Sequence, residues 1–247
     1  MTDTTTALYR DPTAPVDTWV RDLLARMTLR EKVGQLNQRM YGWDAYRRTL
    51  GLPSNSTEAL RAETARFAGL GALYGLFRAD AWSGVDHSNG PGAQESAALA
   101  ELVQRHVIDS SRLGIPALFV EEVPHGHMAL DGTVLPVNLA VGATWDPDLY
   151  ERAAAHAAAE LRARGAHLAL VSALDIARDP RWGRTEECFG EDPHLAARLT
   201  EARSCAGCRA SPVTASPPTR PRRPQALRRP GCHGRRTQLR RVRTRPP

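Results

Sequence analysis

The alternation of short apolar runs with helical stretches is the feature that most restricts how this 247-residue chain can fold. Three runs have the length and composition of buried strands, at 72–77, 115–120 and 167–172. Helical stretches separate them, with some 40 to 50 residues between one strand and the next. Parallel neighbours need crossovers of this kind, so the pattern predicts an α/β protein with a parallel sheet.

Capping signals mark where several helices begin. Thr28 and Glu31 fit a capping box, and an aspartate before a first-turn proline opens helices at Asp146 and Asp192. The expected helical segments are 19–27, 28–36, 57–68, 93–112, 146–165 and 193–202. The glycine-rich segment 78–92 is expected to be a long loop.

Polar and charged residues collect directly after the strands. In a (β/α)8 barrel, the loops at this end of the strands build the active site. Such a barrel takes about 250 residues for its eight units, but only three units precede Arg203. The sequence therefore predicts a partial (β/α)8 barrel of the TIM type, formed by residues 1–202.

The composition changes abruptly at Arg203. Residues 203–247 contain 13 arginines, eight prolines and no acidic residue, which leaves residues 1–202 with 27 acidic and 20 basic residues. The net charge of +6 thus comes from the tail, and the folded part gives no reason to expect nucleic acid as a partner. We expect 203–247 to be a disordered Arg/Pro-rich tail, arising from a frameshift in a GC-rich gene or, alternatively, forming a genuine basic arm.

Membrane, secretory and metal-binding roles find little support in the sequence. No apolar run is long enough to cross a bilayer, and residues 1–16 are polar, so we expect a cytoplasmic protein without a membrane partner. Cys205, Cys208 and the Cys232-His233 pair could ligate zinc, but their segment has too few apolar residues to surround a metal. We expect no metal, and Cys188 is expected to pack rather than react.

Four motifs follow the predicted strands. They are Phe119-Val-Glu-Glu-Val-Pro-His-Gly126, Thr133-Val-Leu-Pro136, Arg178-Asp-Pro-Arg-Trp-Gly-Arg184 with Glu187, and Gly190-Glu-Asp-Pro193. Together they resemble the N-terminal barrel domain of glycoside hydrolase family 3, the β-glucosidase-like enzymes, over residues 28–202. The resemblance implies a small carbohydrate substrate, hydrolysis of terminal non-reducing β-linked sugars by a retaining two-carboxylate mechanism, and no cofactor.

Sugar recognition gives these residue types a reason. A ring of hydroxyls is held by a carboxylate that accepts protons and by an arginine that donates a planar fork. The resemblance assigns these two roles to Glu122 and Arg184. His125 either orders its turn or contacts the sugar, and Trp182 either packs over the barrel edge or stacks beside the sugar. The substrate-binding candidates are therefore Glu122, Arg184, His125 and Trp182.

Neighbouring charged residues have structural interpretations. Glu121 is expected to be an exposed carboxylate at a strand end. Asp179 and Arg181 are expected to brace their loop through an ion pair.

The resemblance also implies groups that this chain does not supply. The family takes its nucleophile, an aspartate usually followed by tryptophan, and its acid/base from later segments, and it uses a Lys-His pair to hold the sugar. Lys32 is the only lysine, and no Lys-His dipeptide occurs. We expect no catalytic residue here and an inactive chain. The alternatives are a sugar-binding pseudoenzyme, and nucleic-acid binding through the basic tail, which lacks interleaved aromatic residues.

Overall fold

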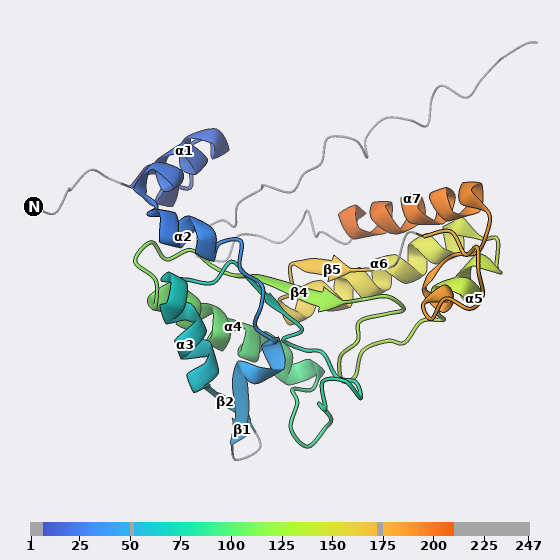
Figure 1. Cartoon of the computed structure of the whole chain (residues 1–247), viewed down its shortest axis with the longest axis horizontal. Helices are drawn as coiled ribbons and strands as arrows, with labels where there is room; N and C mark the ends of the chain where they lie inside the picture. The colour runs from blue at the N-terminus through green and yellow to red at the C-terminus, as the bar shows by residue number, and fades with distance from the viewer. Residues whose placement is uncertain (1–6, 50–51, 172–174, 210–247) are drawn as a thin grey trace, which may run out of the picture. The chain divides into compact units, whose positions relative to one another are not determined.

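The computed structural model describes residues 7–49, 52–171 and 175–209 (Figure 1). The chain divides into two units, one formed by residues 1–25 with 214–247 and the other by residues 26–213. In the described part of the first unit, the turn η1 (Leu8–Arg10) precedes most of helix α1 (Val16–Arg26). The amide of Tyr9 donates a hydrogen bond of 3.0 Å to the Asp22 carboxylate and so joins the turn to the helix.

The second unit contains the sheet and the remaining helices. Its helices are α2 (Leu29–Gly34), η2 (Gly42–Asp44), α3 (Glu58–Phe67), α4 (Ala93–Asp109), α5 (Asn138–Gly142), α6 (Pro147–Arg164), η3 (Thr185–Glu187) and α7 (Pro193–Arg209). Its strands are β1 (Tyr46–Thr49), β2 (Leu52–Ser56), β3 (Ala72–Tyr74), β4 (Leu118–Glu122) and β5 (Leu168–Leu170). Within the described ranges, no helix combines the length and the apolar character that crossing a membrane requires.

Strands β3, β4 and β5 form the predicted parallel sheet, in that order. Leu73 pairs with Phe119, and Val120 pairs with Leu168. The α/β prediction is confirmed, although β3 ends at Tyr74 and β4 extends to Glu122. The antiparallel hairpin of β1 and β2 was not predicted, because its polar sequence lacks the apolar alternation of a strand.

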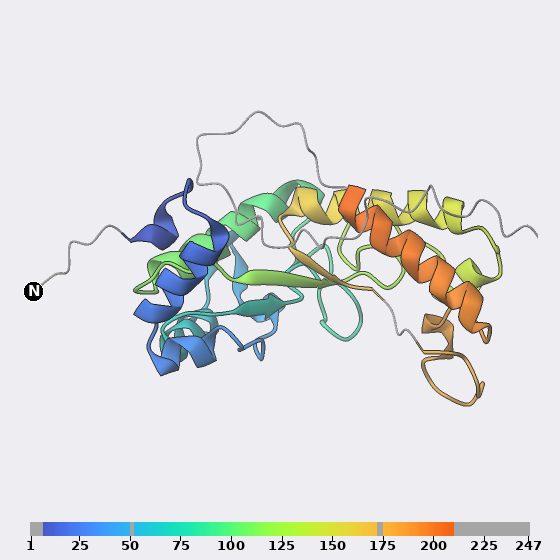
Figure 2. The same ribbon diagram turned by 90° about the horizontal axis from the view of Figure 1, so that it is seen from above.

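The helices cover the sheet and enclose the core. Helices α4 and α6 are in contact, and α6 and α7 lie side by side, as Figures 1 and 2 show. The main core joins the sheet to α3, α4 and α6, and its fully buried large side chains include Leu60, Leu73, Phe77, Leu99, Val103, Val107 and Phe119. A second cluster joins α5, α6 and α7 through Val141, Tyr150, Phe189, Leu195 and Leu199.

Helix α7 continues past the composition break. It was expected to end near Ala202 but runs to Arg209. The Arg203 guanidinium donates to the Pro124 carbonyl at 3.1 Å and to the Tyr150 hydroxyl at 2.5 Å, so this residue packs on the folded unit. Residues 210–247, the larger part of the predicted tail, lie outside the described residues, and the tail remains a prediction.

The capping signals read from the sequence are present. Thr28 and Glu31 form a reciprocal capping box at α2, and Asp146 accepts the Leu149 amide at the start of α6. Glu31 is buried and also accepts two hydrogen bonds from the Arg112 guanidinium, at 2.8 and 3.1 Å. One carboxylate thus caps α2 and joins it to the chain after α4.

This arrangement predicts a pH-dependent contribution to stability. The hydrogen bond from Arg112 lowers the pKa of Glu31 from 4.5 to about 2, although burial acts in the opposite direction. Because the folded-state pKa is depressed, the stabilisation is present above the unfolded pKa and is lost as pH falls through the folded pKa. The melting-temperature difference between wild-type and Glu31→Gln protein should therefore shrink between about pH 6 and about pH 2. The exposed pair of Glu101 and Arg105 supplies the control, because Glu101→Gln should change little at either pH.

Candidate functional site

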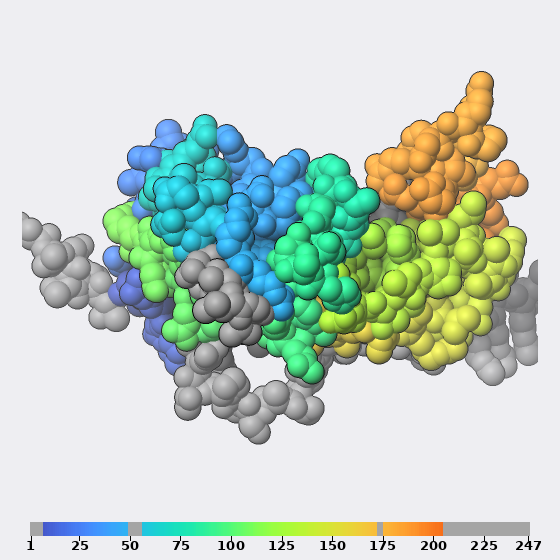
Figure 3. All heavy atoms as spheres, turned by 90° about the horizontal axis from the view of Figure 1, so that it is seen from below, coloured from blue at the N-terminus to red at the C-terminus, as the bar shows by residue number. Residues whose placement is uncertain are grey.

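A polar cavity of about 340 Å³ lies where the loops after the three parallel strands meet. Its lining residues follow β3, lie at the end of β4 or after it, or belong to the segment between β5 and α7. They are Arg78, Glu122, Pro124, His125, Met128, Val137, Asn138, Arg184, Glu186 and Glu187. In Figure 3, the orange segment around residues 180–190 projects from the surface beside the yellow-green segment that follows β4. The cavity occupies the end of the sheet where barrel enzymes place their sites.

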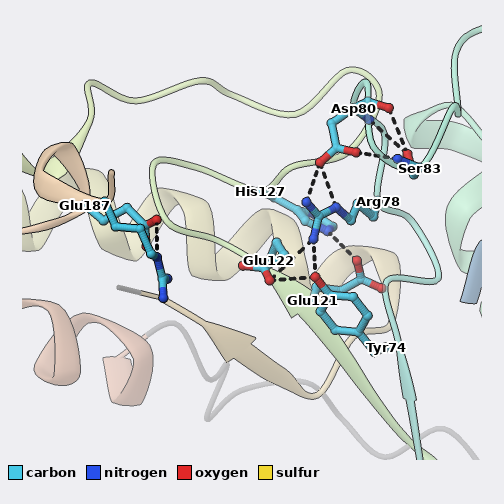
Figure 4. Close-up of polar contacts among 9 residues, drawn as sticks. Tyr74, Arg78, Asp80, Ser83, Glu121, Glu122, His127 and Glu187 are labelled. Carbon is cyan, nitrogen blue, oxygen red and sulfur yellow. Dashed lines mark hydrogen bonds and ion pairs between the residues drawn. The ribbon is translucent and has the colours of Figure 1, made fainter. Parts of the chain in front are cut away.

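Glu122 is the last residue of β4 and is partly buried, with its side chain 26% exposed. Its Oε1 accepts a hydrogen bond of 2.7 Å from the Tyr74 hydroxyl and lies 3.5 Å from Nη1 of Arg78 (Figure 4). Burial and the neighbouring Glu122 raise the pKa of Tyr74, so its hydroxyl remains a donor. The wall of the cavity therefore presents a carboxylate held by one phenol and one guanidinium.

Arg78 is fixed on several sides. Its Nε and Nη2 contact the Asp80 carboxylate at 2.7 and 2.6 Å, and its Nη1 donates to the Tyr74 hydroxyl. The guanidinium carbon lies 4.5 Å from the centre of the Trp82 ring, within cation–π distance. Sequence reasoning missed Arg78 as a site residue and placed it in a glycine-rich loop. Its position just after a strand was the available signal.

Arg184 lies across the cavity on the loop before η3. Its Nε and Nη2 contact both carboxylate oxygens of Glu187, at 2.7 and 2.5 Å, and its side chain is 61% exposed. The hydrogen bond to Glu187 raises the pKa of Arg184. The guanidinium that was expected to grip a sugar is thus held by the carboxylate of Glu187.

The other two sequence candidates have different positions. His125 lines the cavity from the turn after β4, and its carbonyl accepts the Leu135 amide at 2.8 Å. Trp182 is 40% exposed and is not among the cavity's described lining residues. The structure therefore brings Glu122, His125 and Arg184 to one cavity and leaves Trp182 outside its lining.

The expectation for Glu121 was wrong. Its side chain is fully buried, whereas a strand-end carboxylate was expected to be exposed. Glu121 and Glu122 are neighbours on β4 and point to opposite faces of the sheet, so Glu121 enters the layer between sheet and helices. Burial raises the pKa of Glu121.

Two further expectations hold. Asp179 and Arg181 form the predicted ion pair at 2.6 Å, on the surface of their loop. Cys188 is buried, as expected of a packing residue. Among the residues that the structure describes, no group of three or more His, Cys, Asp or Glu side chains is arranged to hold a metal ion.

The fold and the cavity define the class of protein as an α/β protein with a parallel sheet, whose candidate site lies on the loops after the strands. The chain belongs to glycosyl hydrolase family 3, since the model of that family's N-terminal domain matches residues 28–216.

Curated relatives agree with this membership. A periplasmic β-glucosidase of Salmonella typhimurium is 31% identical over 186 residues, which are 75% of this chain and 20% of that protein. A β-xylosidase of Formosa agariphila is 41% identical over 96 residues, which are 36% of this chain and 13% of that protein. The chain thus spans a fifth or less of the length of these two relatives.

Solved structures share the fold. A β-glucosidase from Erythrobacter marinus superposes with a TM-score of 0.63 and 27% identity, over 81% of this chain and 24% of that one. The β-glucosidase of Listeria innocua gives a TM-score of 0.60 and 30% identity, over 78% of this chain and 24% of that one. The α/β architecture predicted from the sequence is therefore that of family 3 β-glucosidases.

Proposed function

We propose that the cavity binds the terminal sugar of a β-glycoside. The observation that supports this most directly is the pairing of Glu122 with Tyr74 and Arg78 on one wall, opposite Arg184. Both contacts to Glu122 involve Oε1, and a carboxylate has about four lone-pair positions, so the group has capacity to accept sugar hydroxyls.

Arg184 supplies the complementary donor. A guanidinium has five N–H groups, of which two point at the Glu187 carboxylate in this structure. The pair is exposed, so exchanging one carboxylate oxygen for a sugar hydroxyl costs little. Glu187 would then orient Arg184 toward the sugar rather than compete with it.

The comparisons favour a β-linked hexose or pentose. The Listeria innocua β-glucosidase has been solved in complex with glucose, and in mutant form with laminaribiose. The relatives include both β-glucosidases and β-xylosidases. Glucose and xylose are therefore the two sugars to test first.

For the whole enzyme we propose retaining hydrolysis by two carboxylates about 5 Å apart. The family resemblance assigns neither the nucleophile nor the acid/base to a residue of this chain. We accordingly propose that the 247-residue chain binds sugar without turnover. Calorimetric titration with glucose and xylose tests the binding, and release of nitrophenol from nitrophenyl β-glucoside and β-xyloside tests the turnover. Turnover that disappears in Glu122→Ala would overturn the second part.

Arg184→Ala should weaken sugar binding roughly tenfold, because it removes a charged donor from the cavity. Arg181→Ala is the matched control, since Arg181 belongs to the same loop and pairs with Asp179 on the surface. Calorimetric titration of both variants with the same sugar shows whether the loss of affinity is specific to Arg184. Equal affinities for the two variants would remove Arg184 from the proposed site.

A further inference from the structure

A buried pair of titratable side chains lies behind the wall of the cavity. Oε2 of Glu121 is 3.5 Å from Nε2 of His127, and both side chains are fully buried. In the described structure, neither ring nitrogen of His127 has a hydrogen-bond partner of good geometry. The same holds for Oε2 of Glu121. Burying such groups costs free energy unless they are paired, so their presence calls for a physical explanation.

The other carboxylate oxygen of Glu121 makes a long-range bond. Oε1 accepts the backbone amide of Phe77 at 3.1 Å, and both groups are buried. Phe77 belongs to the loop after β3, whereas Glu121 belongs to β4. The Glu121 side chain therefore fixes the backbone of one strand-following loop to the end of the neighbouring strand.

The residue after Phe77 is Arg78, which contacts the site carboxylate. Its guanidinium reaches Glu122 at 3.5 Å and the Asp80 carboxylate at 2.6 Å. The direction in which Arg78 leaves the backbone depends on where the Phe77 amide is held. Both glutamates therefore determine the contact between Arg78 and Glu122. Glu121 holds the backbone of the loop that carries Arg78, and Glu122 pairs with the Arg78 guanidinium.

His127 links the loop of Phe77 to the turn after β4. Its ring meets Phe77 edge-on, with centroids 6.0 Å apart and planes at 82°. The neighbouring Met128 amide donates to the Glu122 carbonyl at 3.0 Å, so the chain that leaves the turn returns to the strand end. Two further titratable groups in the described part of the chain interact with Glu121, namely the Tyr46 phenol on β1 and the buried Arg164 guanidinium on α6.

We propose that Glu121 is a positioning residue of the cavity, whose buried carboxylate holds the backbone of Phe77 so that Arg78 meets Glu122. Figure 4 shows the two glutamates with Arg78 and His127 around them. The effect on affinity rests on the sugar-binding function proposed above. The placement of Arg78 is a property of the chain without sugar and can be measured on its own.

Trp82 reports on that placement, because the Arg78 guanidinium lies 4.5 Å from its ring centre. Labelling the full chain with 5-fluorotryptophan gives a 19F signal for each of the five tryptophans, and Trp82→Phe assigns the relevant one. We expect Glu121→Met to shift the Trp82 signal, as Arg78→Ala does. Glu121→Gln should leave it in place, since the amide oxygen can still accept the Phe77 amide.

Affinity should follow the same order. Glu121→Met should weaken glucose or xylose binding roughly tenfold, whereas Glu121→Gln should stay close to wild type. If the methionine variant does not fold, Glu121→Asp replaces it, because its shorter carboxylate no longer reaches Phe77. Glu31→Gln alters another buried carboxylate and should leave the Trp82 signal unchanged.

Two outcomes decide between the proposals. A folded Glu121→Met protein with an unshifted Trp82 signal overturns the positioning role, whatever its affinity for sugar. If Glu121→Met shifts the Trp82 signal but even the wild-type chain binds neither glucose nor xylose, the positioning role stands and the proposed sugar-binding function is overturned.

Discussion

Replacing Glu122 with alanine should weaken sugar binding roughly a hundredfold, because charge-assisted hydrogen bonds to at least two hydroxyls disappear together. The substitution also leaves the partly buried Arg78 without one of its two carboxylate partners, although Asp80 still pairs with it at 2.6 Å. Arg78 should therefore turn toward Asp80 and away from the cavity. This loss exceeds the one expected for Arg184, whose removal leaves the opposite wall intact.

Titration calorimetry with glucose or xylose measures this loss, and two further variants make it specific. Glu122→Gln keeps the shape and one acceptor oxygen, so it should retain more affinity than the alanine variant. Glu58→Ala removes an exposed carboxylate that pairs with Arg61 on α3 and should bind sugar like wild type. Wild-type affinity in a folded Glu122→Ala protein would exclude the cavity as the sugar site.

Gly126→Ala should destabilise the fold by about 3 kcal/mol or more and displace the turn that carries His125. Gly126 has a φ of +96°, a conformation that side chains rarely adopt. A Cβ at this position would lie 2.0 Å from the Thr133 carbonyl oxygen, which is backbone and cannot rotate away. The same turn is fixed by the hydrogen bond from the Leu135 amide to the His125 carbonyl.

Gly84→Ala is the matched control for this experiment. Gly84 also has a positive φ, of +66°, but an added Cβ would meet no atom within 4 Å. The Gly84→Ala variant should therefore lose only about 1 kcal/mol of its free energy of unfolding, which is the cost of placing a side chain at positive φ. Urea denaturation of both variants gives the two free energies of unfolding. Equal losses would show that the contact with Thr133 has no effect.

Local signals in the sequence predicted most of the architecture. The capping box of Thr28 and the Asp-Pro start at Asp146 act within one turn of a helix, so the sequence contains both partners. The apolar runs located the three strands, because β-strands buried between helices have few polar positions. The end of the second strand differed from the prediction, since the apolar run stopped at residue 120 whereas β4 includes Glu121 and Glu122.

The missed features depend on residues that are distant in sequence. Glu121 is buried by the loop of Phe77, 44 residues away, and no periodicity in β4 indicates that contact. Arg78 becomes a cavity residue only because Glu122 and Tyr74 come beside it when the strands pair. The composition break at Arg203 did not end α7, because the Arg203 side chain finds carbonyl and hydroxyl partners on the folded unit.

The cavity wall is built from one continuous stretch of the chain. Its described lining residues run from Arg78 to Glu187 along the chain. If the proposed sugar site is correct, exchanging this one segment should alter the contacts that the wall offers to a sugar. A family member of different sugar preference could donate that segment.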